Sequence, residues 1–167
     1  DQVMQPDGRE GVYGVVHFRN QAVGVVAIDS LDRVLLVGQH RYPLDQYSLE
    51  IPAGGCPWGS DTLEAARREL REETGWSAEC WRLIACSHLS NSVTDEEAFI
   101  YLASNMRDGD PEPEGTEILD VQWVPFEEAL RMTIDGRITD SMTLIGLQRA
   151  ALVRYAPQLV PADECIP

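Results

Sequence analysis

The sequence predicts an α+β fold organised as a single domain. Its 167 residues, of which 44% are apolar, suffice for one well-buried core and are too few for two ordinary domains. Segments with strand patterns and segments with helix patterns are mixed along the chain rather than strictly alternating, which favours α+β architecture. Each expected element rests on its own local signal.

Runs of β-branched and aromatic residues between polar breaks predict the strands. The first two runs are separated only by Arg19 and Asn20, so we expect a tight turn to join them. Segment 39–43 is expected to leave the third strand, and Pro52 to bar further pairing after the fourth, because proline has no backbone N–H. The predicted strands are 11–18, 22–28, 34–37, 48–51, 81–87, 99–102 and 118–124.

The best defined helix is expected over residues 62–74. Asp61 is a good N-cap, and Glu64 follows it three residues later, which is the spacing of a capping box. Gly75 is a good C-terminal stop because glycine adopts the left-handed conformation without steric cost.

Two further helices are expected near the carboxyl end. Pro125 favours a helix start immediately after it, and Thr139 is expected to cap a longer helix with several apolar faces. Segment 107–116 is polar and rich in proline and glycine, so we expect a mobile loop there.

The charge balance limits the possible partners. The chain has 13 basic and 28 acidic side chains, giving a net charge of −15. This charge repels nucleic acid backbones and anionic membrane surfaces, so neither is expected as a partner. It equally repels a diphosphate substrate, whose attraction must then come locally from bound metal and a few arginines. No apolar run approaches the roughly 20 residues that span a bilayer.

The four cysteines show no paired spacing, so neither a zinc knuckle nor a dithiol redox motif is predicted. Reduced thiols in a cytoplasm are the simplest interpretation. Residues 1–7 show no signal-peptide pattern, although the chain begins without an initiating methionine. We therefore expect a cytoplasmic location.

A dense carboxylate cluster lies on the helix predicted at 62–74. At about 100° per residue, Glu69, Glu72 and Glu73 share one face, while Leu63 and Leu70 lie on the apolar side. Hard carboxylate oxygens suit Mg²⁺ or Mn²⁺. Spacing alone leaves open a second interpretation, in which these acids form a solvated face that pairs with neighbouring arginines.

The segment from Ala53-Gly54 to Gly75-Trp76 resembles the signature of the Nudix hydrolases. The Arg-Glu pair at 68–69 and the Glu pair at 72–73 stand at the signature positions. The sequence around this segment is most similar to the branch that hydrolyses ADP-ribose and related nucleoside diphosphate sugars. One signature glutamate is absent, because Ser60 stands in its place. The resemblance implies an α/β/α sandwich with a mixed sheet and an additional N-terminal β-sheet.

The resemblance also assigns roles to the signature residues. It implies that Glu69, Glu72 and Glu73, with the backbone carbonyl of Ala53, hold Mg²⁺, for which Mn²⁺ is a possible substitute. Arg68 is expected to orient Glu69 or Glu72 by charge-assisted hydrogen bonds.

The glycine pair and a downstream loop complete the expected machinery. Gly54 and Gly55 are expected to let the backbone approach metal or phosphate closely. The resemblance places a general base on a loop far beyond the signature, where Glu117 is the first candidate and Glu114 the second. The alternative is that these acids only solubilise the loop.

Substrate contacts are expected from three further positions. Arg41 is a candidate for the diphosphate, Tyr42 or Tyr47 for stacking on the base, and Glu96 for the metal site or the terminal ribose. The proline that ADP-ribose hydrolases carry in this region would fall at Asn91 and is absent. We therefore expect the broader class of nucleoside diphosphate sugars.

The resemblance implies one Nudix domain over 1–167, with 1–30 as N-terminal strands that support a homodimer and 31–167 as the catalytic core. We expect a metal-dependent pyrophosphohydrolase that releases a nucleoside monophosphate and a sugar phosphate. Two alternatives remain: a nucleotide-sugar sensor weakened by Ser60, and a hydrolase of nucleoside triphosphates or dinucleotide polyphosphates.

Overall fold

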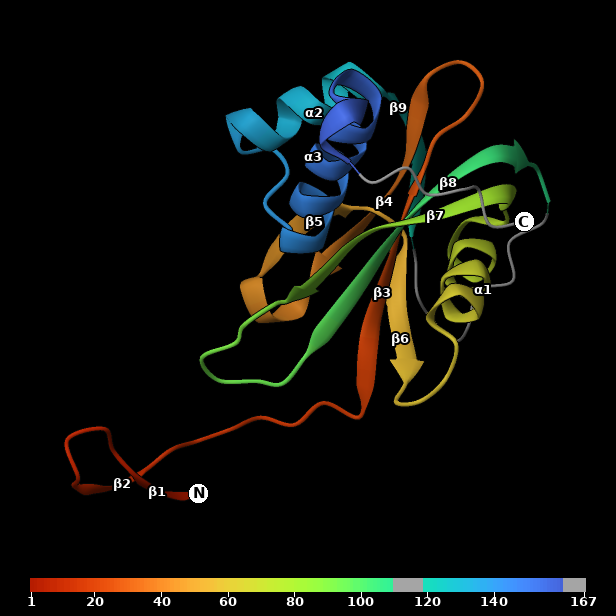
Figure 1. The fold of residues 1–167 in the computed structure, drawn as a ribbon. Helices are drawn as coiled ribbons and strands as arrows, with labels where there is room; N and C mark the ends of the chain where they lie inside the picture. Colours follow the sequence, from red (N-terminus) through yellow and green to blue (C-terminus); the bar gives the residue numbers. More distant parts are fainter. Residues whose placement is uncertain (110–118, 161–167) are drawn as a thin grey trace.

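The computed structural model describes residues 1–109 and 119–160, and within them the strands form three sheets (Figure 1). The largest has the order β6-β3-β8-β7, with strands Ala53–Pro57, Asn20–Ala27, Glu97–Arg107 and Ser77–His88. The second has the order β5-β4-β9, with strands Gln46–Glu50, Arg33–Arg41 and Asp120–Pro125. The third pairs β1 and β2, at Gln2–Met4 and Glu10–Val12.

Strand β3 lies at the centre of the mixed sheet. It runs antiparallel to β6 on one side and parallel to β8 on the other. Because side chains alternate along a strand, Val23 and Val25 join one buried cluster while Val26 joins another. The two faces of the sheet therefore face two separate parts of the core.

Helices cover both faces, as Figure 1 shows. Helix α1, at Thr62–Thr74, packs Ala66 and Leu70 with Val23 and Val25. Helices α2 and α3, at Phe126–Asp135 and Ser141–Tyr155, pack in the cluster that contains Val26. The predicted α/β/α sandwich with a mixed sheet and a small N-terminal sheet is confirmed.

Helix α1 has the bounds that the sequence predicted. The Asp61 side chain accepts hydrogen bonds from the backbone N–H groups of Leu63, at 2.8 Å, and Glu64, at 3.4 Å. Gly75 ends the helix with a φ of 79°, and its N–H donates to the carbonyl of Arg71. Local signals define both ends of the helix.

The predicted hairpin of 11–18 and 22–28 is wrong. Only Glu10–Val12 forms a strand in the first segment, and it pairs with β1 rather than with β3. Beyond β2, Val16 makes an isolated bridge to Thr94. The N-terminal hairpin β1-β2 consequently lies apart from the main body, at the end of an extended segment (Figure 1).

Three other boundaries differ from expectation. Strand β4 continues to Arg41 because it pairs with β5 through residues 39–41. Pairing resumes directly after Pro52, since β6 joins the other sheet and begins at Ala53. Asp140, not Thr139, caps α3 by accepting from the N–H of Thr143 at 2.8 Å. Of the loop expected over 107–116, Arg107 is the last residue of β8, residues 108 and 109 follow without helix or strand, and residues 110–116 lie outside the described residues.

The structure also bears on membrane-spanning segments and on the state of the cysteines. Among the described residues, no helix is long and apolar enough to cross a membrane. Cys56 and Cys86 are free thiols, as expected, but Cys80 is disulfide-bonded, so the prediction of reduced cysteines does not hold for it.

Candidate active site

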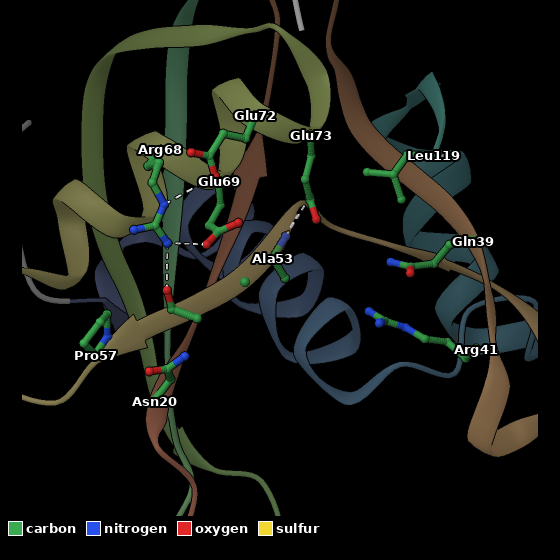
Figure 2. A pocket seen from close by; sticks show the side chains of 12 residues that line it. Asn20, Gln39, Arg41, Ala53, Pro57, Arg68, Glu69, Glu72, Glu73 and Leu119 are labelled. Atoms are coloured by element: carbon green, nitrogen blue, oxygen red, sulfur yellow. Dashed lines mark hydrogen bonds and ion pairs between the residues drawn. The ribbon is translucent and has the colours of Figure 1, made fainter. Parts of the chain in front are cut away.

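A pocket of about 550 Å³ opens between helix α1, strand β6 and strand β4. Figure 2 shows the glutamates of α1 on one side and Gln39, Arg41 and Leu119 on the other. Its lining is Asn20, Gln39, Arg41, Ala53, Gly54, Gly55, Pro57, Arg68, Glu69, Glu72, Glu73 and Leu119. The structure thus brings together the metal-binding candidates, the glycine pair, Arg68 and Arg41.

The carboxylate of Glu69 lies directly over Gly54. A Cβ atom added at Gly54 would lie 2.1 Å from Cδ of Glu69 and within 2.4 Å of both carboxylate oxygens. A side chain at position 54 would displace this carboxylate, so glycine is what lets Glu69 lie against the backbone of β6. The close approach places a helix carboxylate against a strand backbone.

Arg68 links the two elements through its guanidinium group. Its Nη2 donates to the backbone carbonyl of Gly55 at 2.8 Å and to Oε1 of Glu69 at 2.5 Å. Its Nε lies 3.3 Å from Oε2 of Glu72. The hydrogen bond to Glu69 is the largest cause that raises the pKa of Arg68, so the arginine stays charged and holds both carboxylates.

Glu73 anchors the strand on the other side of Gly54. Its Oε2 accepts a hydrogen bond from the backbone N–H of Ala53 at 3.1 Å. Figure 2 places Glu73 between the Arg68 cluster and the side chains of β4. Consecutive residues of β6 are therefore held by side chains of one helix.

The donor set suits a hard divalent cation. No group of three or more His, Cys, Asp and Glu side chains within the described ranges is already arranged around one point. Glu69, Glu72 and Glu73 nevertheless line one pocket beside the backbone of β6, and all their donor atoms are oxygens. The residues present fit Mg²⁺ or Mn²⁺, provided that the carboxylates turn from their present partners toward the ion.

Arg41 forms a two-point ion pair that sequence reasoning missed. Its Nε and Nη2 donate to the two carboxylate oxygens of Glu50 at 2.9 and 2.5 Å. The Glu50 side chain is only 6% exposed, whereas that of Arg41 is 42% exposed and lines the pocket. Glu50 therefore fixes the guanidinium group of Arg41 at the pocket wall.

The other expected substrate residues lie elsewhere. Tyr42 is 89% exposed on the turn after β4 and does not line the pocket. Tyr47 lies over Gly38 and donates to Asp120 at 3.0 Å. Glu96 also lies outside the lining, and burial raises the pKa of its carboxyl group. Tyr42 and Glu96 are therefore not among the residues that the structure brings together in this pocket.

Several lining residues had no sequence signal of their own. The side chain of Asn20 lies over Gly55, where an added Cβ would meet its amide nitrogen at 2.6 Å. Gln39, Pro57 and Leu119 also reach the pocket only because of the fold. The register of Asn20 opposite Pro57 could have been found only by knowing that β3 pairs with β6.

Two further sequence predictions concern Ser60 and the loop glutamates. Ser60 is exposed in the turn before α1, and its N–H donates to the carbonyl of Pro57 at 3.0 Å. Glu112, Glu114 and Glu117 lie outside the described residues.

The fold and the site define a class of protein. A mixed-sheet α/β/α sandwich that gathers helix glutamates, an arginine and a glycine strand in one pocket is typical of hydrolases that use a divalent cation on phosphate anhydrides. Residues 18–142 match the NUDIX domain, and the chain belongs to this family.

Comparison with characterised proteins gives relatives over most of the chain. The chain is 33% identical to an ADP-ribose pyrophosphatase of Mycobacterium tuberculosis, covering 88% of this chain and 72% of that protein. It is 32% identical to a methanol dehydrogenase activator of Bacillus methanolicus, covering 89% and 80%. It is 31% identical to a GDP-mannose pyrophosphatase of Yersinia pestis, covering 77% and 69%.

A solved structure shows the same fold. The crystal structure of an ADP compounds hydrolase superposes with a TM-score of 0.80, covering 93% of this chain and 85% of that chain at 22% identity. The likeness supports the architecture of the sandwich.

Replacing Gly54 by alanine should disrupt the site while leaving the fold intact. The added methyl group would overlap the Glu69 carboxylate, so we expect Mn²⁺ affinity and kcat to fall by about tenfold or more. Isothermal calorimetry with Mn²⁺ measures the first quantity. Gly14→Ala is the control, since an added Cβ there meets nothing within 4 Å. Unchanged Mn²⁺ affinity in Gly54→Ala would contradict the close approach.

The Glu50 carboxylate should give acid-sensitive stability. Burial alone raises its pKa, but hydrogen bonds from Arg41 and Ser48, with the charge of Arg41, bring it below the ordinary 4.5. Its contribution is thus fully present above about pH 4.5 and is lost as the pH falls through the lowered pKa. We expect Glu50→Gln to lower the free energy of unfolding by about 2 kcal/mol at pH 7.

This difference should shrink as the pH falls below 4, in urea titrations of both proteins. Glu64→Gln is the matched control, because its exposed pair with Arg67 should contribute under about 1 kcal/mol. A Glu50→Gln difference that is independent of pH would contradict the assignment.

Proposed function

We propose that this protein is a metal-dependent pyrophosphohydrolase that cleaves nucleoside diphosphate sugars of the ADP-ribose kind into a nucleoside monophosphate and a sugar phosphate. The observation that carries the proposal is the Glu69 carboxylate seated on Gly54 and held by Arg68. Relatives named as ADP-ribose and GDP-mannose pyrophosphatases, each more than 30% identical, support this substrate class.

Divalent metal is a general requirement of Nudix hydrolases, and Mg²⁺ is the ion we propose here. Glu69, Glu72 and Glu73 would hold it with the carbonyl of Ala53. When bound, the ion would neutralise phosphate charge and lower the pKa of water, so that water could lose a proton to a base and become a nucleophile for phosphorus. Arg68 holds two of these carboxylates in register through the contacts described above.

Arg41 is proposed to bind the diphosphate. Its guanidinium group is held in place by Glu50 and is partly exposed at the pocket wall opposite Glu73. Fixed donors recognise phosphate oxygens without the entropy cost of ordering a flexible side chain. Because the whole chain carries a charge of −15, this arginine and the metal supply the local attraction.

The general base is proposed to come from Glu117 or Glu114. The three glutamates of α1 that line the pocket are proposed to hold the metal, so a further carboxylate is needed to accept the proton from water. Leu119, which directly follows the undescribed segment, lines the pocket. Because Leu119 stands only two positions after Glu117 in the sequence, its place in the lining supports Glu117 as the first candidate.

We further propose that the protein is a cytoplasmic homodimer formed through the N-terminal sheet. The arm that carries β1 and β2 lies apart from the body (Figure 1), and Met4 and Val12 on it are 66% and 76% exposed. Exposed apolar side chains on a projecting sheet favour burial against a second copy of the chain. The free thiols Cys56 and Cys86 favour a reducing compartment, whereas the disulfide of Cys80 argues against one.

A turnover panel tests the activity. ADP-ribose, GDP-mannose, UDP-glucose and the common nucleoside triphosphates are each incubated with Mg²⁺, with and without chelator, and monophosphate release is measured. We expect the nucleoside diphosphate sugars to be cleaved only when metal is present. Glu73→Gln should lower kcat by about 100-fold, because it removes a charged metal ligand. Glu64→Gln on the same helix should stay within about twofold.

Three outcomes would contradict this proposal. Binding of ADP-ribose without any turnover would favour the sensor alternative, and full turnover by Glu73→Gln would remove the metal assignment. Faster cleavage of nucleoside triphosphates than of every nucleoside diphosphate sugar would favour the alternative of a triphosphate hydrolase.

The dimer has its own test. Sedimentation equilibrium of the wild type should give twice the 18.6 kDa chain mass, and Met4→Asp with Val12→Asp should give the monomer, because both replacements place charge in the proposed interface. Glu10→Gln, on the same sheet, should leave the dimer intact. A monomeric wild type at micromolar concentration would overturn the proposal.

A further inference from the structure

The chain crosses from one sheet to the other at Ile51 and Pro52. Strand β5 ends at Glu50 in the three-stranded sheet, and β6 begins at Ala53 in the four-stranded sheet. Both linking residues are buried, and Pro52 has no backbone N–H. The N–H of Ile51 is therefore the single backbone donor of a buried link, and it needs a partner.

A buried hydroxyl group on α3 supplies that partner. The N–H of Ile51 donates to Oγ1 of Thr143 at 2.9 Å, and Thr143 is completely buried. The Thr143 hydroxyl in turn donates to Oδ2 of Asp140 at 2.7 Å. Because its proton is committed to Asp140, the hydroxyl oxygen is left to accept from Ile51.

The next two residues of the chain are fixed as well. The carbonyl of Pro52 accepts from the N–H of Val25 at 2.9 Å, and the N–H of Ala53 donates to Glu73 at 3.1 Å. The side chain of Ile51 also packs against Gly24. A Cβ atom added at Gly24 would lie 2.9 Å from Cδ1 of Ile51. Hydrogen bonds at three consecutive residues, 51 to 53, thus connect the start of α3 through the backbone to a glutamate of α1.

We propose that Thr143, oriented by Asp140, is a positioning residue that sets where Ala53 and Gly54 lie against the glutamates of α1. This inference rests on the proposed function, because the glutamates matter as metal ligands there. Thr143 is not one of the residues that line the pocket, so its effect passes through Ile51 to the backbone of β6. Asp140 also acts on Arg41 through its charge, so the start of α3 influences both walls of the pocket.

Thr143→Val tests the hydroxyl alone. Valine keeps a similar volume, the Asp140 charge and the backbone cap, and it removes the hydroxyl that accepts from Ile51 and donates to Asp140. We expect Mn²⁺ affinity, measured by calorimetry without substrate, to fall about tenfold, and kcat to fall about 10-fold to 100-fold with KM within about threefold. Thr143→Ser, which restores the hydroxyl, should return both values to within about twofold.

Thr133→Val is the control variant. The Thr133 hydroxyl donates to the carbonyl of Leu130 within α2, remote from the pocket lining, so we expect no change in either value. Should Thr143→Val give no folded protein, Thr143→Cys carries the test, because a thiol is a weak acceptor of similar size.

The outcomes separate this inference from the proposed function. A folded Thr143→Val protein with wild-type Mn²⁺ affinity and kcat overturns the inference, as does a Thr143→Ser protein that is equally impaired. If the wild type cleaves no nucleoside diphosphate sugar while Thr143→Val still binds Mn²⁺ more weakly than Thr143→Ser, the proposed function fails and the positioning role stands.

Discussion

The site depends on how closely helix α1 can approach strand β6. The carboxylate of Glu69 occupies the space that a side chain on residue 54 would fill, and the Arg68 guanidinium group joins that carboxylate to the carbonyl of Gly55. Glycine at 54 is therefore required for the Glu69 carboxylate to lie at this position, while the arginine compensates the charge brought against the backbone. Packing holds α1 and β6 at this separation, because Leu70 of α1 is buried in the same cluster as side chains of the neighbouring strand β3. Chemistry and packing are carried by opposite faces of one helix.

Electrostatics explain why a strongly acidic protein can act on an anionic substrate. A net charge of −15 provides no long-range attraction for a diphosphate. Both arginines that line the pocket are bound to glutamates, Arg68 to Glu69 and Glu72, and Arg41 to Glu50. These pairs give precise direction to the guanidinium groups, but they add little net positive charge. A divalent cation bound among the carboxylates resolves the imbalance, because it adds positive charge where phosphorus must be attacked.

The sequence predicted those parts of the fold that local interactions determine. The bounds of α1 follow from Asp61, Gly75 and a helical apolar period, all within one segment. The N-terminal hairpin was wrong because the partners of β3 are β6 and β8, which are distant in the sequence and leave no local signal. For the same reason the ion pair of Arg41 and Glu50 was not predicted, because the pairing of β4 with β5 brings the two residues together. The hydrogen bond between Ile51 and Thr143 was also not predicted, because it joins residues 92 positions apart. The signature glutamates were found because their spacing is helical.

The most direct test of the account is a crystal structure of the protein soaked with Mn²⁺ and a non-hydrolysable ADP-ribose analogue, with the ion located by anomalous scattering. The account predicts a Mn²⁺ peak about 2.2 Å from carboxylate oxygens of Glu69 and Glu73 and from the Ala53 carbonyl, with the diphosphate bridging the ion and Arg41. A peak absent from this pocket, or an analogue bound elsewhere with Glu69 still paired to Arg68 alone, would contradict it.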